Sequence, residues 1–408
     1  MTLILSNDDI RKSLSLKECL NVMEETYREL ASSRAVNRPT SQSYLPHSLP
    51  QSTYNFKSVD GGVGKYGVLA LRITSTVDQE QHVNNSVRLE KLPLAKGMFV
   101  GLVQLFSAET GELLAIMIKQ YLLSPGPTPI PNEVALAMSE TMIHHRTPQF
   151  NKIFEEARQG LKTLFGTNGD VLILASSGTG AMEAAVANLF SPGDKVLVIN
   201  GGKFGERWLN ISNAFGLDPI EIKVEWGQAV RVADVEKQLE LHPDIQSVMI
   251  QASETSTTVL HPVKEIAKLT ENGPLFLVDG VTAVGVLPVP LDEWDIDVLV
   301  TGSQKALMLP PGLGFIALSD RAWEKTNKAK LPRFYFDLNL ERKNQAKGSG
   351  AFTPAVSLIF GLRASLNMMA REGFDRVYAR HARMARATRA AATAMIPSSP
   401  RARRAPRG

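Results

Sequence analysis

Two residues that can do chemistry stand at the ends of apolar segments in this 408-residue chain. Asp279 closes the apolar run at residues 274–278, and Lys305 follows it by 26 positions at the end of Thr-Gly-Ser-Gln-Lys. Upstream, the loop at residues 177–180 reads Ser-Gly-Thr-Gly. An anion-binding loop, a buried acid and an amine in this order supply what pyridoxal 5'-phosphate needs. These needs are a phosphate site, a partner for the pyridine nitrogen and a Schiff-base amine.

The loop at residues 177–180 has the composition of a phosphate cradle. It follows the apolar run at residues 171–175, and a series of good helix formers begins at Ala181. Small residues let the backbone approach an anion, and a helix N-terminus adds N–H groups and the positive end of its dipole. Taken alone, the loop is equally compatible with a glycine-rich turn that binds nothing.

Two further loops follow expected strands and offer groups for a flat heteroaromatic ring. Phe204 lies in Gly-Gly-Lys-Phe-Gly and can stack on such a ring. Thr255 lies in a hydroxyl-rich loop, and Asp279 would keep the ring nitrogen protonated. Singly, Phe204 also fits a core position, Asp279 a helix N-cap and Lys305 the surface. Their order along the chain favours the cofactor site.

Short apolar runs alternate with helical patterns from residue 121 onward. The expected strands are residues 171–175, 195–200, 247–251, 274–279, 297–301 and 314–319. This alternation predicts an α/β fold with a largely parallel sheet. Ligands in open sheets of this kind bind at the carboxyl ends of the strands, where the candidate residues are expected to meet. The pattern of residues 368–393 predicts one long helix.

The first 117 residues follow a different pattern, which predicts a small α+β module. An amphipathic helix is expected at residues 16–30. Expected strands are residues 67–76, 98–106 and 113–118. Residues 62–67 match the Gly-x-Gly-x-x-Gly spacing of a dinucleotide-binding loop, but a strand pattern follows where that motif needs a helix. We interpret the match as coincidental.

Composition excludes several classes of protein. The chain is 44% hydrophobic and 21% charged, as expected of a globular protein, and no uninterrupted apolar stretch approaches membrane-spanning length. The N-terminus lacks the basic and apolar regions of a signal peptide. The single cysteine, Cys19, excludes intrachain disulfides and fits a reducing compartment. We therefore expect a cytoplasmic protein without a membrane role.

Positive charge is confined to the end of the chain. Nine arginines and no acid follow Asp375, so residues 1–375 carry a net charge of −5 against +4 for the whole chain. A nucleic-acid-binding surface would interleave basic and aromatic residues, and this segment has only Tyr378. We expect no nucleic-acid partner, and we expect residues 393–408 to form a disordered basic tail.

Over about residues 118–392 the chain resembles the class V, fold type I pyridoxal phosphate-dependent aminotransferases. The similarity is greatest to the alanine–glyoxylate and serine–glyoxylate (or serine–pyruvate) group. The matching stretches are residues 122–129, 144–150, 177–184, 201–208, 253–257, 278–282, 302–305, 310–315 and 352–356. The resemblance implies a fold type I large domain with its cofactor at the strand ends.

The same resemblance implies a role for each candidate residue. Lys305 would bind the cofactor covalently and move the proton, and Asp279 would pair with the pyridine nitrogen. Phe204 would stack on the ring, and Thr255 would lie near the phenolic oxygen. The expected phosphate ligands are Ser177, Gly178, Thr179, Gln304 and, from the second subunit of a homodimer, Thr353.

Residues 1–117 resemble a second family, the N-terminal region of ornithine cyclodeaminase and mu-crystallin-like proteins. The similar stretches are residues 3–9, 67–72 and 105–115. In that family a nicotinamide-binding Rossmann domain follows, whereas here the aminotransferase-like sequence follows directly. Arg38 and Arg72 match basic groups that bind a substrate carboxylate there, and we expect them to catalyse nothing without that domain.

The expected function is transamination between a small amino acid of the alanine or serine class and a 2-oxo acid such as glyoxylate. Aminotransferases of this family continue into a smaller domain with an arginine that binds the substrate carboxylate, and here the arginine-rich tail follows instead. We therefore expect a reduced rate, unless Arg146 or Arg333 takes that role. Two alternatives stay open: an inactive cofactor-binding or interaction protein, and a nicotinamide-dependent cyclodeaminase or amino-acid dehydrogenase.

Overall fold

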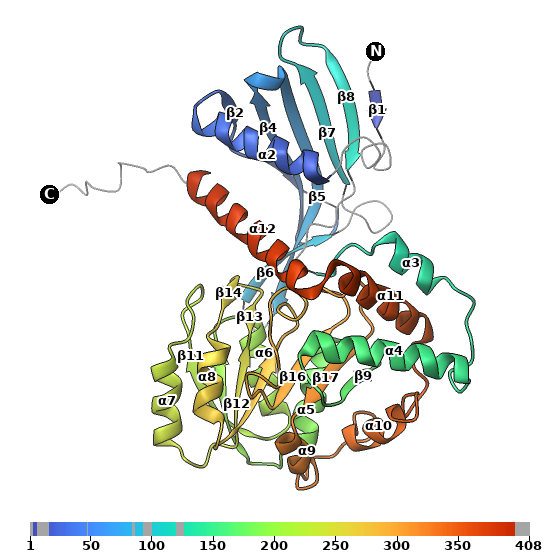
Figure 1. Ribbon diagram of the computed structural model, residues 1–408. Coiled ribbons are helices and arrows are strands. Elements are labelled where there is room, and N and C mark those ends of the chain that lie inside the picture. The colour runs from blue at the N-terminus through green and yellow to red at the C-terminus, as the bar shows by residue number, and fades with distance from the viewer. Residues whose placement is uncertain are drawn as a thin grey trace, which may run out of the picture. The chain divides into compact units, whose positions relative to one another are not determined.

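The computed structural model describes residues 3–5, 16–46, 48–83, 86–92, 100–119 and 126–395. The chain divides into two compact units, labelled by element in Figure 1. One unit comprises residues 1–121 together with 387–408, and the other comprises residues 122–386. The predicted tail at residues 393–408 lies almost wholly outside the described residues.

The first unit is built on an eight-stranded sheet with one long helix, α2 (Leu16–Ala31). Its strands are β1 (Leu3–Leu5), β2 (Ala35–Asn37), β3 (Ser41–Pro46), β4 (Ser52–Val63), β5 (Val68–Val83), β6 (Ser86–Leu92), β7 (Val100–Ser107) and β8 (Leu113–Lys119). The strand order is β1-β8-β7-β5-β4-β2, with β3 paired to β4 and β6 to β5. Only the β1–β8 pairing among these is parallel.

The α2 helix and the strands β5, β7 and β8 correspond to expected elements, but the sheet is larger than the sequence pattern indicated. β4 was missed because its sequence carries two glycines, a lysine and an aspartate in place of a regular alternation. A short 3-10 helix, η1 (Gly64–Tyr66), separates β4 from β5, and Glu25 of α2 accepts hydrogen bonds from Lys65 and Tyr66 within it. A strand follows Gly67 where a dinucleotide-binding loop needs a helix. This confirms the prediction that the glycine spacing at residues 62–67 is a coincidental match.

The second unit contains a seven-stranded sheet in the order β11-β10-β12-β15-β16-β17-β9. These strands are β9 (Val171–Leu174), β10 (Lys195–Asn200), β11 (Asp218–Lys223), β12 (Ser247–Gln251), β15 (Leu275–Asp279), β16 (Val298–Gly302) and β17 (Gly314–Leu318). All neighbours are parallel except β17, which is antiparallel to both β16 and β9. The predicted α/β fold with a largely parallel sheet is confirmed, although the edge strand β11 was not predicted.

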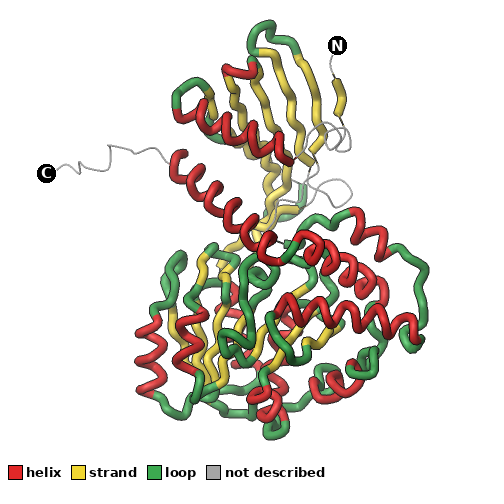
Figure 2. The backbone as a smooth tube through the Cα atoms, in the orientation of Figure 1, coloured by secondary structure: helices red, strands yellow, loops and turns green. Residues whose placement is uncertain are grey.

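Helices cover both faces of this sheet (Figure 2). The helices are α3 (Asn132–Met138), α4 (Pro148–Phe165), α5 (Gly178–Leu189), α6 (Lys203–Ala214), α7 (Val232–Leu241), α8 (Val263–Thr270), α9 (Asp320–Thr326), α10 (Leu338–Gln345), α11 (Val356–Glu372) and α12 (Phe374–Met395), which the unit includes as far as Arg386. A small hairpin of β13 (Ser253–Glu254) and β14 (Val259–Leu260) follows β12.

The apolar core of this unit has two parts, one on each face of the sheet. Alternate strand residues point to opposite faces, so Ile199 of β10 packs in one part and Val198 in the other. The first part includes side chains of α4, α8 and α11, such as Phe154. The second includes side chains of α5, α6 and α9, such as the fully buried Trp208. Burial on both faces explains the nearly continuous apolar runs in the sequence.

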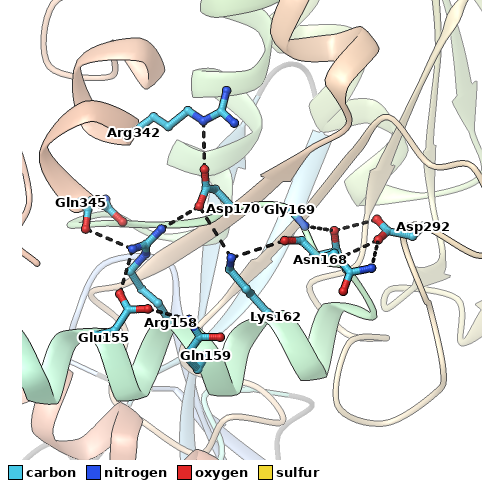
Figure 3. Close-up of polar contacts among 11 residues, drawn as sticks. Glu155, Arg158, Gln159, Lys162, Asn168, Gly169, Asp170, Asp292, Arg342 and Gln345 are labelled. Carbon is cyan, nitrogen blue, oxygen red and sulfur yellow. Dashed lines mark hydrogen bonds and ion pairs between the residues drawn. The ribbon is translucent and has the colours of Figure 1, made fainter. Parts of the chain in front are cut away.

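A polar network ties α4 and α10 to the start of β9 (Figure 3). The guanidinium of Arg158 is buried and donates to Asp170 at 2.8 Å, while Arg342 Nε donates to the other oxygen of Asp170 at 2.9 Å. The side chain of Gln345 accepts the Ile173 N–H and donates to the Ile173 carbonyl. Gln345 thereby pairs with the backbone at the edge of the sheet, where a neighbouring strand would otherwise bind.

The expectation of one continuous helix over residues 368–393 is wrong. α11 ends at Glu372, and α12 begins at Phe374 after Gly373, whose φ of +88° only glycine adopts readily. Arg380 of α12 donates to Glu372 across this break at 2.6 Å. Among the residues described, no helix is long and apolar enough to cross a membrane.

Candidate active site

The carboxyl ends of β12, β15 and β16 lie side by side, because these strands are parallel and in register. Gln251 is paired with Asp279, and Asp279 is paired with Val300. The loop that follows β16 carries Lys305. The sheet therefore gathers side chains that are far apart in the sequence at one edge, which is where open α/β sheets bind their ligands.

Asp279 is a buried acid in an environment that disfavours its charge. Only 4% of the residue is exposed, and its Oδ1 accepts the Val281 N–H at 2.8 Å. Burial raises the pKa of Asp279 to about 6, and Glu254 adds to the rise, whereas the Val281 N–H, Arg207 and Lys305 oppose it. A carboxylate held in this way is matched to a cationic partner such as a protonated ring nitrogen.

Lys305 is half-buried and interacts electrostatically with Asp279. Burial is the main cause that lowers the pKa of the Lys305 ammonium, and Arg207 lowers it further, while Asp279 opposes the change. The loop around it is anchored by Thr128, whose hydroxyl donates to the Lys305 carbonyl at 2.9 Å. A Cβ at Gly126 would collide with the lysine side chain. The structure thus brings the two predicted catalytic residues together, and it makes the neutral amine more accessible than in a free lysine.

The predicted phosphate cradle is the N-terminus of α5. Ser177 is the N-cap residue, and the helix begins at Gly178, so the N–H groups of its first turn lack acceptors within the helix. Two glycines allow close approach of the chain here. A Cβ at Gly178 would come within 2.6 Å of Val281, and a Cβ at Gly302 within 3.1 Å of the Gly178 nitrogen.

Gln304 lies beside this cradle. Its Oε1 is buried and has no hydrogen-bond partner among the described residues, and it points toward the same space above Gly302 that the Gly178 nitrogen borders. The side-chain nitrogen of Gln304 is the group that can donate to an anion. The unpaired oxygen itself would repel an anion, so the contribution of Gln304 to a phosphate site would come from this NH2 group.

Phe204 lies in the first turn of α6 and not in a free loop after β10. The helix N-terminus is capped by Glu254 of β13, whose Oε2 accepts the N–H groups of Phe204 at 3.0 Å and Gly205 at 3.1 Å. The other oxygen accepts the N–H and hydroxyl of Ser256. Glu254 is fully buried, and a negative charge at this end of a helix is stabilised by the helix dipole.

Two residues of the site were missed from the sequence. Glu254 precedes Thr255 in the hydroxyl-rich segment, and Arg207 lies within the matching stretch at residues 201–208. The only signal in the sequence was a charged residue within a small and polar segment, because the hydrogen-bond partner of Arg207 is 28 positions away. Arg207 donates to Thr179 at 2.9 Å, and its guanidinium lies 4.7 Å from the centre of the Phe204 ring.

Thr255 and Thr353 differ in how the structure places them. Thr255 donates to Thr282 at 3.0 Å, and Thr282 donates to the Ser253 carbonyl, so the turn that carries Thr255 packs against the loop that follows Asp279. Thr353 is exposed and lines a cavity of about 20 Å³ with Tyr335. No described contact joins Thr353 to the other candidate residues.

Arg333 does not present a free guanidinium to a substrate. It donates to the carbonyls of Thr326 at 2.9 Å, Ala329 at 3.3 Å and Ala187 at 3.4 Å. Arg146 is exposed and precedes α4. Arg333 therefore holds together α5 and the segment after α9 through these backbone contacts.

The residues at this edge fit pyridoxal phosphate, because they combine an amine of lowered pKa, a buried acid and an anion-binding helix N-terminus. Comparison with known proteins agrees. Residues 120–398 match the family model of the class-V aminotransferases. The chain is 45% identical over 270 residues to the soluble hydrogenase 42 kDa subunit of Anabaena cylindrica, which covers 64% of this chain and 70% of the relative.

Two further relatives carry the name of an activity. The L-aspartate–glyoxylate aminotransferase of Paracoccus denitrificans is 38% identical, over 63% of this chain and 66% of that protein. The crystal structure of alanine–glyoxylate aminotransferase from Nostoc sp. superposes with a TM-score of 0.61 and 32% identity, over 64% of this chain and 70% of that one. The chain belongs to the class-V aminotransferases, enzymes of the fold type I architecture that use pyridoxal phosphate.

Proposed function

We propose that this protein transfers an amino group between a small amino acid of the alanine or serine class and a 2-oxo acid such as glyoxylate. The observation that carries the proposal is the coupling of Asp279 and Lys305 at one sheet edge, where each has its pKa displaced toward the neutral form. Glyoxylate is named as a substrate in two of the related proteins, and the match of residues 120–398 supports the same class of reaction.

Each residue of the site has a role in this proposal. Asp279 would hold the pyridine nitrogen, Phe204 would cover one face of the ring, and Thr255 would lie near the phenolic oxygen. The phosphate ligands would be Ser177, Gly178, Thr179 and Gln304. Pyridoxal phosphate, when bound, supplies an electron sink that stabilises negative charge at the substrate Cα.

Lys305 would both hold the cofactor and move the proton. An amine of lowered pKa is neutral in a larger fraction of molecules, so Nζ could accept the proton from the substrate Cα and deliver it in a 1,3-shift to the carbon on the other side of the shared nitrogen. Proton transfer by a positioned group contributes roughly 100- to 10,000-fold in rate. Loss of this amine is therefore expected to remove turnover almost completely.

A homodimer is part of the same proposal. Thr353 is exposed beside an aromatic cluster in which Tyr335 stacks on Phe352 at 5.0 Å and Phe334 is 78% exposed. Covering such a patch with a second copy would bury apolar surface and bring Thr353 to the neighbouring cofactor. Sedimentation analysis of the wild type and of Phe334→Asp tests this point.

A panel of amino donors with glyoxylate tests the function. The holoprotein is mixed with alanine, serine, aspartate or ornithine, and the conversion of the cofactor to its amine form is followed by absorbance, with return on addition of glyoxylate. We expect conversion with alanine or serine, and none in Lys305→Ala. A borohydride-fixed cofactor on Lys305 without any conversion would indicate a binding protein, and turnover that requires NAD(H) would favour a cyclodeaminase or dehydrogenase.

A further inference from the structure

Arg207 connects α6 and α5, two helices that contribute different residues to the proposed site. It lies in α6, one turn after Phe204, and its guanidinium stands 4.7 Å from the centre of that ring. Its Nη1 donates to the hydroxyl of Thr179 in the first turn of α5 at 2.9 Å. One side chain therefore links the aromatic ring to the helix N-terminus that is expected to bind phosphate.

The position of Arg207 also has an electrostatic consequence. The charged groups that face Asp279 are Arg207 from α6, Glu254 from β13 and Lys305 from the loop after β16. Glu254 opposes ionisation of Asp279, and of the two cations that favour it, Arg207 has the larger effect. Arg207 therefore supplies positive charge near Asp279 in addition to that of Lys305.

We propose that Arg207 is a positioning residue of the pyridoxal phosphate site, which holds Phe204 and Thr179 in place and balances the buried negative charge of Asp279. The inference rests on the proposed cofactor contacts of these three residues. It assigns Arg207 no contact with the reacting atoms. Its two effects are separable, because a lysine keeps the charge but cannot reproduce the planar fork that stacks on Phe204 and reaches Thr179.

The test uses pyridoxamine phosphate, the amine form of the cofactor, because it cannot bond covalently to Lys305. Its dissociation constant for the apoprotein is measured between pH 5 and 8.5 by quenching of tryptophan fluorescence. Protonation of Asp279 removes the partner of the ring nitrogen, so affinity should fall as pH falls through the pKa of Asp279. The variants are Arg207→Gln, Arg207→Lys and Thr179→Val, and Arg231→Gln, an exposed arginine of an i,i+3 pair, is the control.

Loss of one charge-assisted contact corresponds to about a tenfold or greater change in a binding constant. We expect Arg207→Gln to bind about tenfold more weakly at pH 7, with the midpoint of the pH dependence moved upward. Arg207→Lys should keep the wild-type midpoint at reduced affinity, and Thr179→Val should do the same. The control should match the wild type.

Unchanged affinity and midpoint in Arg207→Gln would overturn the inference, as would equal weakening of the lysine and glutamine variants with no change of midpoint. If Arg207→Gln does not fold, wild-type affinity in both Arg207→Lys and Thr179→Val would overturn the proposed link instead. If the wild type itself does not bind pyridoxamine phosphate, the cofactor site is refuted. This outcome differs from failure of the Arg207 inference, because the wild type, every variant and the control would then all fail to bind.

Discussion

Glu254 caps a helix that starts fifty residues earlier in the chain, by accepting the backbone N–H of Phe204 at 3.0 Å. The bond sets the direction of the first turn of α6 and hence the position of the Phe204 ring. The residue after Glu254 is Thr255, which bonds to Thr282 close to Asp279. One short hairpin therefore positions groups on two sides of the proposed cofactor site.

Substitution of Glu254 is expected to weaken both folding and cofactor binding. In Glu254→Gln, the amide nitrogen replaces an oxygen that accepts two hydrogen bonds, so at least one buried backbone N–H loses its acceptor. An unsatisfied buried group costs about 1–3 kcal/mol in the free energy of unfolding. Urea denaturation of the apoprotein measures it, with Glu236→Gln on the exposed face of α7 as the control. Equal stability of the two variants would show that the cap is dispensable.

The stability of the apoprotein should depend on pH through Asp279. Its pKa is about 6 when folded and near 3.8 when exposed, so the native state binds the proton more tightly than the unfolded state. The associated stability is present at low pH and is lost as pH rises from about 4 through about 6, by about 3 kcal/mol.

Asp279→Asn removes this titration while keeping the shape of the side chain. Urea unfolding of the two apoproteins between pH 4.5 and 7 should give free energies that diverge, with the wild type falling relative to the asparagine variant. Parallel curves would mean that Asp279 has the same pKa in the folded and unfolded states. Burial would then not raise the pKa of this carboxyl group.

The close approach at Gly178 predicts a sharp effect of one methyl group. In Gly178→Ala the new Cβ would lie 2.6 Å from Val281, so the α5 N-terminus and the loop after β15 must move apart. Because hydrogen bonds to an anion weaken steeply with distance and angle, we expect the dissociation constant of pyridoxal phosphate to rise at least about tenfold. Equilibrium dialysis measures it. Gly273→Ala, where a Cβ meets nothing within 4 Å, should bind as the wild type does.

The network of Figure 3 predicts unequal contributions from two arginines that share Asp170. Arg158 is buried, and its loss removes the donor to the Gln345 carbonyl and the closest donor to Asp170 Oδ1, so Arg158→Ala should destabilise by about 3 kcal/mol. The Arg342 side chain is 43% exposed, and Arg342→Ala should cost at most about 1 kcal/mol. Thermal unfolding separates the two, and equal losses would contradict the burial argument.

Much of the second unit could be predicted from local sequence. Strand sequences such as that of residues 195–200 are apolar on both faces because both faces are covered, and the loops after them carry small or polar residues. The order of Ser177, Asp279 and Lys305 along the chain, each after such a strand, was enough to place them at one edge. Parallel strands in one sheet leave no other arrangement for their carboxyl ends.

Local pattern failed where the conformation depends on distant contacts. β4 pairs over its whole length with β5, although polar and apolar residues alternate poorly in its sequence. Gly373 ends one helix before the next begins, within a segment whose pattern predicted a single helix. Arg207 and Glu254 show the same limit at the site. Their hydrogen bonds join residues 28 and 50 positions apart, and no spacing rule links them.

The amino-acid sequence by itself predicted the class of fold from strand periodicity, and it predicted a cofactor and a set of candidate residues from their chemistry, their order and a family resemblance. Only the tertiary structure decided which charges surround Asp279, what holds Phe204 in place and how much each group is buried. Burial and charge proximity are properties of the packed chain, and they set the pKa of Asp279 and Lys305 on which the chemistry depends.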